Sequence, residues 1–113
     1  MSSAECIFCR IAAGEIPCRK VYEDGDLIAF HDINPAAPVH FMIVPKEHIV
    51  SLVQAEARHE GLLGRMLLLS PVLAQEQGLG DGFRTIINTG RGGGQEVMHL
   101  HVHVMGGGRL RPM

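Results

Sequence analysis

The segment 98–106 reads Met-His-Leu-His-Val-His-Val-Met-Gly, and its strict alternation constrains the fold more than any other part of the chain. Side chains alternate between the two faces of a strand, so a strand here would project all three imidazoles from one face, with successive rings ~6.5–7 Å apart. Three titratable, nucleophilic rings on one surface contribute little to stability, so we expect the chemistry of the protein at this strand. The three histidines are His99, His101 and His103, and the residues expected to face a core are Leu100, Val102 and Val104.

Length and charge limit the classes of function that fit the chain. With 113 residues, the sequence predicts one domain over residues 1–113 with a modest core. Ten basic and twelve acidic side chains give a formal charge of −2, which gives no support for electrostatic capture of nucleic acid or of a membrane surface. Without Trp, and with one Tyr and four Phe, the chain has little material for stacking bases. We therefore expect any phosphorylated ligand to be small and held by specific groups.

The cysteines and the N-terminal residues indicate the cellular compartment. The chain does not open on a basic region followed by an apolar run, so we expect no secretory signal. No stretch approaches the ~18 apolar residues of a membrane helix. Cys6, Cys9 and Cys18 cannot all pair within one chain, and the CxxC spacing of Cys6 and Cys9 suggests metal or redox use. A reducing, cytoplasmic location is the expectation.

The remaining pattern predicts an α+β fold with a mainly antiparallel sheet, because the elements follow the order short helix, strands, long helix, strands. Apolar runs, turn residues and glycines mark the boundaries of the elements. The predicted elements are a short helix over 5–13 closed by Gly14, a hairpin of strands 19–23 and 27–31, a strand over 39–44, a long helix over 55–77, a strand over 82–89 and a mobile loop over 90–94.

The long helix over 55–77 carries apolar residues on more than one face. One stripe runs through Leu62–Leu73, whereas Leu68 and Val72 extend the apolar surface toward the far side. One sheet face is too narrow to cover this surface, so we expect a second subunit on the helix. Pro71 should kink the helix or remove one backbone hydrogen bond.

Three interpretations of the histidine strand compete. It could be a solvated strand face, a metal site in which an HxH pair donates two rings to zinc, or a centre for covalent catalysis by a neutral imidazole. No carboxylate stands as an obvious third ligand for the metal interpretation. Consecutive glycines at 92–94 allow backbone N–H groups to converge on an anionic oxygen, so this loop favours covalent catalysis at phosphorus.

The residues 99–105 fit the histidine-triad pattern, in which single apolar residues separate three histidines. The chain resembles the histidine-triad (HIT) family over nearly its whole length, and within it the histidine-triad nucleotide-binding proteins, which are purine nucleoside phosphoramidases. The stretches that stand in the family's order are Ile7–Ile11, Gly14–Pro17, Phe30–Pro35, Ala37–Phe41, Val44–His48 and Gly93–Gln95.

This resemblance implies a HIT-like fold with a five-stranded sheet, one long and one short helix, and a homodimer whose two sheets join into one. Each protomer would bind a purine nucleotide such as AMP or GMP, and catalysis would require no cofactor. His101 would attack phosphorus and expel an amine, and water would hydrolyse the nucleotidyl-histidine. The carbonyl of His99 would accept the inner N–H of His101, while His103 and His40 would flank the phosphate as donors or as a proton relay.

The resemblance also assigns the residues that would hold the nucleotide. The phosphate contacts would come from Asn88, Gly94, Gln95 and Glu96, the ribose contact from Asp32, and the apolar purine slot from Phe8, Ile11, Phe30, Ile33 and Met42. Without the resemblance, the apolar residues would be read as ordinary core, and Asp32 and Asn88 as turn residues. His31 and His59 match nothing catalytic and are expected to be surface or structural.

Two features depart from the family pattern. Animal members carry serine at the position of Glu96, so this carboxylate either turns outward and leaves only its N–H to the phosphate, or contacts the cationic amine that is expelled. The tail after Gly108 ends early and lacks a tryptophan found in the animal proteins. For these reasons the leaving-group preference of the family is not transferred to this chain.

The resemblance further implies a zinc site, because four residues match the zinc ligands of some bacterial members: Cys6, Cys9, His48 and His99. Two thiolates and two imidazoles suit a closed tetrahedral structural site. Zinc there would join the N-terminal helix to the sheet edge and remove His99 from a catalytic role. The alternative is a pair of reduced, packed cysteines, and the sequence leaves both open.

Three functions are consistent with these residues. The first is hydrolysis of the P–N bond of purine nucleoside phosphoramidates, extending to aminoacyl-adenylates. The second is dinucleoside polyphosphate hydrolysis, typical of another branch of the superfamily. The third is a nucleotide-binding regulatory module with incidental catalysis.

Overall fold

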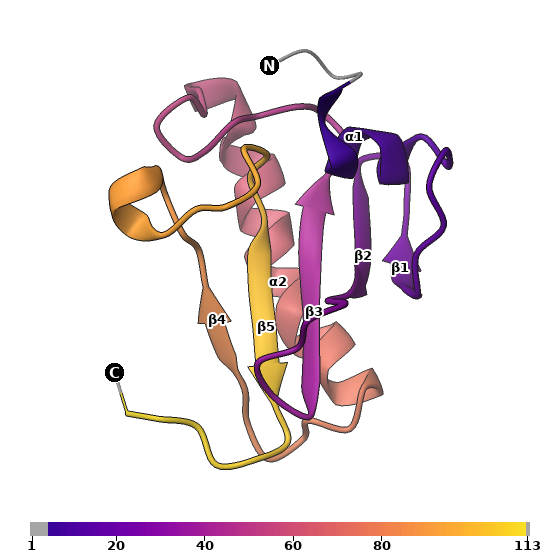
Figure 1. Ribbon diagram of the computed structural model, residues 1–113, viewed down its shortest axis with the longest axis vertical. Helices are drawn as coiled ribbons and strands as arrows, with labels where there is room; N and C mark the ends of the chain where they lie inside the picture. The colour runs from indigo at the N-terminus through magenta and orange to yellow at the C-terminus, as the bar shows by residue number, and fades with distance from the viewer. Residues whose placement is uncertain (1–4, 113) are drawn as a thin grey trace.

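Five strands form one open antiparallel sheet in the order β1-β2-β3-β5-β4 (Figure 1). The computed structural model describes residues 5–112, and residues 1–4 and Met113 lie outside the described part. The expectation that the N-terminal segment carries no secretory signal falls in part on residues 1–4. The α+β class and the mainly antiparallel sheet with one long and one short helix are confirmed. The strands are β1 (Lys20–Glu23), β2 (Leu27–His31), β3 (Val39–Pro45), β4 (Arg84–Ile86) and β5 (Val102–Gly106).

Alternation along the central strands divides the core into two layers, one on each face of the sheet. The long helix α2 (Glu60–Glu76) covers one face, and the short helix α1 (Ile7–Ala12) lies over part of the other (Figure 1). The core on the side of α2 includes the sheet residues Phe41, Ile43, Val102 and Val104 and the helix residues Met66 and Leu73. Those on the face of α1 include Ile28, Phe30, Met42, Phe8 and Ile11.

Helix α1 is shorter than the predicted helix over 5–13 because Cys6 is its N-cap. Cys6 has an extended backbone, and its Sγ accepts the N–H of Cys9 at 3.3 Å. At the other end Gly14 has a φ of 79°, and the N–H of Glu15 bonds the carbonyl of Arg10 at 2.9 Å. This is a Schellman ending, so the predicted role of Gly14 is confirmed.

Helix α2 begins later than predicted, after a 3-10 turn η2 (Ala57–His59), and it continues through Pro71. Proline has no N–H for the carbonyl of Leu67, and the hydroxyl of Ser70 donates to that carbonyl instead, at 2.6 Å. Leu68 and Val72 remain exposed, so this chain alone does not cover the second apolar side of the helix. Within residues 5–112, no helix is long and apolar enough to cross a membrane.

The strands that flank the histidines are shorter than the sequence predicts. The predicted strand over 82–89 is reduced to β4, and residues 99–101 precede β5 instead of belonging to it. Pro45, at the end of β3, has no N–H with which to continue the ladder, and the N–H of Leu100 bonds the carbonyl of Ile49 at 2.7 Å. The predicted loop over 90–94 contains a 3-10 turn, η3 (Arg91–Gly93).

Candidate active site and metal-ligand cluster

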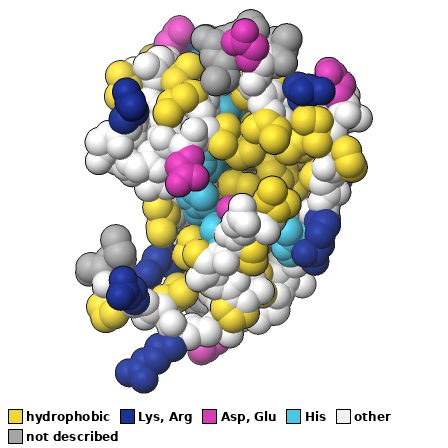
Figure 2. Space-filling model, viewed as in Figure 1, with side chains coloured by type: hydrophobic (Ala, Val, Ile, Leu, Met, Phe, Trp, Pro, Cys, Tyr) yellow, Lys and Arg dark blue, Asp and Glu magenta, His cyan; other side chains and the backbone are white. Residues whose placement is uncertain are grey.

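A cavity of about 760 Å³ opens on the face of the sheet that carries α1. Figure 2 shows hydrophobic side chains gathered there beside the histidines. All five residues assigned to the purine slot line this cavity: Phe8, Ile11, Phe30, Ile33 and Met42. Four of them also belong to the core of that face, whereas Ile33 is 91% exposed at the rim. The core interpretation and the slot interpretation therefore both describe these side chains.

His101 lines the cavity, and its hydrogen-bond partner determines which ring nitrogen carries the hydrogen. Its Nδ1 lies 2.7 Å from the carbonyl oxygen of His99, and a carbonyl can only accept, so Nδ1 carries the hydrogen. The predicted acceptor is thereby confirmed. Nε2 keeps its lone pair, while burial lowers the pKa of the ring and the bond to the His99 carbonyl opposes that effect. The edge of the Phe8 ring packs against the imidazole, with centroids 5.1 Å apart.

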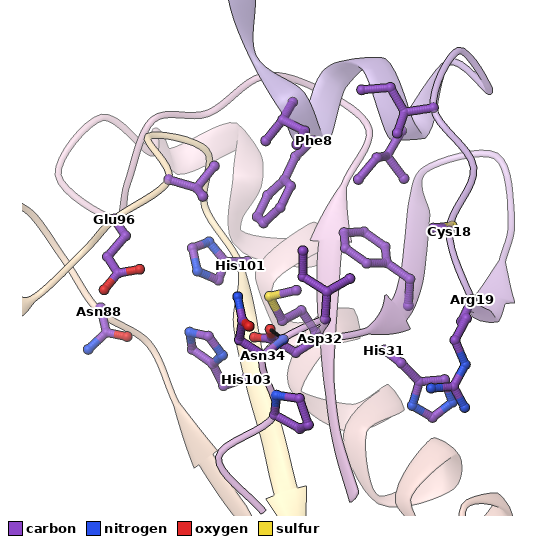
Figure 3. A pocket seen from close by; sticks show the side chains of 18 of the residues that line it. Phe8, Cys18, Arg19, His31, Asp32, Asn34, Asn88, Glu96, His101 and His103 are labelled. Carbon is purple, nitrogen blue, oxygen red and sulfur yellow. Dashed lines mark hydrogen bonds between the residues drawn. The ribbon is translucent and has the colours of Figure 1, made fainter.

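A chain of hydrogen bonds fixes the tautomer of His103 in the same way. The backbone N–H of Ala36 donates to Nδ1 of His40 at 3.0 Å, so neutral His40 carries its hydrogen on Nε2. That nitrogen lies 2.9 Å from Nδ1 of His103 and donates to it, which leaves the hydrogen of His103 on Nε2. Beside the lone pair of His101, the site thus presents an N–H on a neighbouring ring, with the two centroids 4.8 Å apart (Figure 3).

Burial keeps these rings neutral near pH 7. Burial, with a smaller contribution from the neighbouring histidines and against the opposing effect of Asp32, lowers the pKa of His103 to about 4. Burial also lowers the pKa of His40, against the attraction of Asp32, whose carboxylate lies 3.6 Å from His40 Nε2. Asp32 also accepts the N–H of Asn34 at 2.8 Å, so it is both the predicted turn residue and a residue of the site.

Asp32, His40 and His103 lie close enough together to hold a metal ion, but the hydrogen positions oppose it. A metal would need the lone pair of His40 Nε2, and that nitrogen carries the hydrogen because Nδ1 is occupied by the N–H of Ala36. In this triplet, His40 and His103 are joined by a hydrogen bond, and the Asp32 carboxylate lies 3.6 Å from His40 Nε2.

A second cluster gathers Cys6, Cys9, His48 and His99 from α1, the loop after β3 and the segment before β5. Cys6 Sγ lies 3.1 Å from His99 Nδ1, Cys9 Sγ lies 3.2 Å from His48 Nδ1, and the two Nδ1 atoms are 3.2 Å apart. Tetrahedral zinc with sulfur and imidazole ligands would hold these atoms roughly 3.3–3.8 Å apart. The four residues therefore fit zinc after a small expansion.

The hydrogen positions favour a metal in this second cluster. His99 Nε2 donates to the carbonyl of Pro45 at 2.7 Å, so the Nδ1 lone pair points at the sulfur atoms. Burial lowers the pKa of His99 to about 4 and raises that of Cys9 to about 11, so without a metal the His99 ring is neutral and the Cys9 thiol is protonated. His48 Nε2 is buried and has no hydrogen-bond partner among the described residues.

The glycine-rich loop and its neighbours, residues 88–96, contribute some residues to the cavity wall and others to the shape of the loop. Asn88, Gly94 and Glu96 line the cavity, and Asn88 Nδ2 donates to the carbonyl of Gly93 at 2.8 Å. Gln95, assigned to the phosphate, turns its side chain inward. Its amide bonds Gly90, Val50 and Val97, so the side chain shapes the loop and does not line the cavity.

The remaining lining residues were not expected from the sequence. His31, left as surface or structural, lines the cavity with Cys18, Arg19 and Asn34. His31 and Asn34 stand in the Phe30–Pro35 stretch but were given no role in the site, and Cys18 and Arg19 stand in none of the matching stretches. His59 is buried against the Glu47 carboxylate at 2.9 Å, as expected of a structural residue.

Comparison with known proteins places these features in a family. Residues 13–110 match the model of the HIT domain. The chain belongs to the HIT domain family. It is 59% identical over 101 residues to the HitA protein of Neisseria gonorrhoeae, covering 89% of this chain and 94% of that protein. The part of this HIT protein that matches the family model does not include Cys6 or Cys9.

Two further HIT-like proteins are similar to the chain. A 14 kDa zinc-binding protein of Zea mays is 46% identical over 106 residues, which cover 92% of this chain and 83% of that protein. The crystal structure of a HIT family hydrolase from Legionella pneumophila matches with a TM-score of 0.91 at 44% identity, over 95% of this chain and 96% of that one.

Proposed function

We propose that this HIT protein hydrolyses the P–N bond of purine nucleoside 5′-phosphoramidates, and that aminoacyl-adenylates are further substrates. The observation that carries the proposal is the hydrogen bond from His101 Nδ1 to the His99 carbonyl, which leaves Nε2 as a nucleophile in a cavity with an apolar slot. A neutral imidazole is a good nucleophile near neutral pH, and the P–N bond that it forms is labile enough to turn over.

The reaction proceeds in two displacements at phosphorus. In the first, the lone pair of His101 Nε2 forms a bond to phosphorus, and the amine leaves with the electrons of the broken P–N bond and takes up one proton. In the second, water attacks phosphorus, the bond to His101 breaks, and the nucleoside monophosphate is released. The His99 carbonyl holds the positive charge that develops on the ring through the Nδ1–H.

His103 supports both displacements as a hydrogen-bond donor. Its Nε2–H would bind a non-bridging phosphate oxygen, where negative charge grows in the transition state. His103 begins neutral, because burial lowers its pKa to about 4, and a neutral ring cannot give up its one hydrogen without becoming an imidazolate. We therefore infer that water at the cavity mouth supplies the proton of the departing amine.

The other lining residues would hold the nucleoside. The apolar slot would sandwich the purine, and the Asp32 carboxylate would accept hydrogen bonds from the ribose hydroxyls. The backbone N–H of Glu96 would bind the phosphate, and Gly94, with a φ of 81°, has no side chain to obstruct the anion. The N–H groups of Gly94 and Gln95, which were also expected to contact the phosphate, instead donate to the carbonyls of Arg91 and Gly90.

We also propose a structural zinc ion on Cys6, Cys9, His48 and His99. When bound, zinc would stabilise the fold by joining α1 to the sheet, and all four of its positions would be filled by the protein. The converging ligand atoms and the Pro45 contact of His99 support this site, as does the zinc-binding relative from Zea mays. No step of the reaction passes through the metal.

A homodimer in the cytoplasm completes the proposal. β4 lies at one edge of the sheet, so two copies could pair their β4 strands into a continuous sheet. Leu67, Leu68 and Val72 of α2 are 47%, 76% and 53% exposed, and a second copy would cover them. The free thiols Cys6, Cys9 and Cys18 agree with a reducing compartment.

The test is mass spectrometry of the protein quenched during turnover of adenosine 5′-phosphoramidate. We expect an adenylyl adduct on the peptide that contains His101, and no adduct in the His101→Asn variant. Turnover without an adduct on this residue would contradict the mechanism, and faster turnover of diadenosine polyphosphates would contradict the substrate class.

A further inference from the structure

The charges that line the cavity are unevenly distributed around the reacting histidines. Arg19 is the one lysine or arginine among the lining residues, and it lies beside His31 at the end of the cavity far from His101 (Figure 3). The two lining carboxylates are Asp32 and Glu96. A substrate phosphate at His101 would therefore lie near two carboxylates and no protein cation.

The two carboxylates differ in what they contact. Asp32 accepts the N–H of Asn34 and lies 3.6 Å from His40. The Glu96 carboxylate is exposed and makes no hydrogen bond or ion pair with any residue in the described range 5–112. It lies with Asn88 on one side of His101 (Figure 3). Because no described residue pairs with this carboxylate, it has no structural role in the loop.

The geometry also separates the two halves of a substrate. The apolar slot from Phe8 to Phe30 is the cavity wall suited to a purine, and Asp32 lies on that side of the reacting rings (Figure 3). With the nucleoside there, a substituent on the departing nitrogen would extend along the remaining wall. That wall is formed by Asn88, Gly94 and Glu96.

An unpaired carboxylate beside a phosphate anion weakens binding of the anion, because like charges repel at close range. The same carboxylate strengthens binding of a substrate that brings a positive charge to this wall. We propose, on the basis of the proposed function, that Glu96 is a specificity-determining residue: it selects phosphoramidates and aminoacyl-adenylates whose leaving group carries a protonated amine in addition to the reacting atom.

The additional ammonium takes no part in bond making. His101 Nε2 forms the bond to phosphorus. In a phosphoramidate the P–N bond breaks and the departing nitrogen takes its proton from water as before; in an aminoacyl-adenylate the P–O bond to the amino-acid carboxyl group breaks and the carboxylate leaves without taking up a proton. The distal ammonium pairs with the Glu96 carboxylate throughout the first displacement. It therefore raises kcat/KM for the first displacement and has no effect on hydrolysis of the adenylyl-histidine, from which the amine has already departed.

The test compares two substrates that differ only in charge. Adenosine 5′-phosphoramidate of 1,5-diaminopentane carries a distal ammonium, and that of hexylamine has a methyl group in its place. We expect wild-type kcat/KM to favour the diamine substrate roughly three- to fivefold, the range of an exposed ion pair, and the preference to fall with added salt. In Glu96→Gln the two substrates should react at nearly equal rates.

A matched control and a binding measurement complete the test. Glu60→Gln removes an exposed carboxylate at the start of α2, which is not a lining residue of the cavity, and it should leave the substrate preference unchanged. Glu96→Gln should also bind AMP about two- to fivefold more tightly by calorimetry, because it removes a repelling charge.

The outcomes separate this inference from the proposed function. One outcome is that the wild type and Glu96→Gln show the same preference between the two substrates and the same affinity for AMP. This outcome would show that the carboxylate only faces solvent, and it would overturn the role of Glu96 without affecting the proposed phosphoramidase activity. If neither phosphoramidate reacts, the proposed function fails, and unchanged AMP affinity in Glu96→Gln would then overturn the inference as well.

Discussion

Two groups of histidines lie on the same face of this sheet, and they differ in where their ring hydrogens go. In the cluster of Cys6, Cys9, His48 and His99, the His99 ring donates outward to Pro45 and turns its lone pair toward two sulfur atoms. In the group around His101, the ring donates to the protein backbone and turns its lone pair toward an open cavity. The first arrangement is suited to hold a metal, and the second to attack an electrophile.

In each of the two groups, one backbone carbonyl accepts the ring hydrogen of a histidine and so decides where the lone pair of that ring points. Neighbouring histidines of one motif can therefore have different chemistry. His99 and His101 are two residues apart, yet His99 is fully buried against cysteines while His101 contacts the cavity. His99 belongs to both groups, since its side chain joins the cluster and its carbonyl positions His101. Substitutions that remove one ring at a time can separate these two roles.

The largest expected effect comes from removing His101, the proposed nucleophile. His101→Ala should lower phosphoramidase kcat by about 10⁴-fold or more, because the covalent route is lost. Its zinc content should stay near that of the wild type, since the ring is not a metal ligand, and its melting temperature should fall only modestly, because the buried ring loses its contact with Phe8. Steady-state kinetics, metal analysis and thermal unfolding give the three readouts. Near-wild-type turnover would remove His101 from the mechanism.

His99→Ala is the matched variant and should show the reverse pattern. It keeps the backbone carbonyl that accepts from His101 and loses one metal ligand, so zinc content and melting temperature should fall much further than kcat. If both variants lost activity equally and both kept zinc, the division between the two groups would be wrong.

The second prediction concerns the cysteines. Cys6→Ser with Cys9→Ser should abolish stoichiometric zinc and lower the free energy of unfolding by several kcal/mol, on the order of 3–5 at neutral pH, since metal binding is coupled to folding. Turnover measured well below the melting temperature should persist. Cys18→Ser is the control, because Cys18 does not belong to the ligand cluster. Full zinc content in the double variant, or none in the wild type, would contradict the site.

The sequence predicted the faces of the histidine segment better than its ends. Alternation correctly placed Val102 and Val104 in the core, and His101 and His103 on the opposite face. It could not predict that β5 begins only at Val102, because the ladder stops where Pro45 lacks an N–H and Leu100 bonds Ile49 instead. Strand ends depend on such partners across the sheet, which local pattern does not contain.

The sequence predicted many members of the site but only one of its hydrogen positions, that on His101 Nδ1. Motif resemblance named the slot residues and the metal-ligand set, and the structure brings each group together. The N–H of Ala36 that fixes His40 depends on the path of a turn. The inward side chain of Gln95 depends on the N–H of Gly90 and on the carbonyls of Val50 and Val97. Both arise from tertiary contacts that a sequence does not specify residue by residue.

The smallest expected effect is a pH dependence that distinguishes the buried, neutral rings from solvent-exposed histidine. The pKa of His103 in the folded protein is about 4, below its ordinary value of 6.5, because burial disfavours the charged ring. Between these two values the unfolded chain binds a proton that the folded chain does not, so stability falls as the pH is lowered from 6.5 toward 4. Above pH 7 the ring is neutral in both states and the dependence disappears.

His103→Asn removes this titration and keeps an acceptor for the N–H of His40. Measured by denaturant unfolding, the wild type should lose about 1–2 kcal/mol more than the variant between pH 6.5 and pH 4. Carboxylates whose pKa values are lowered, such as those of Asp24 and Glu47, also destabilise the fold in acid, but they do so equally in both proteins and cancel in the difference. Parallel stability curves would mean that His103 already carries a proton in the folded protein at neutral pH, or that it titrates as freely as in the unfolded chain, and the assignment of a neutral donor beside a neutral nucleophile would fail.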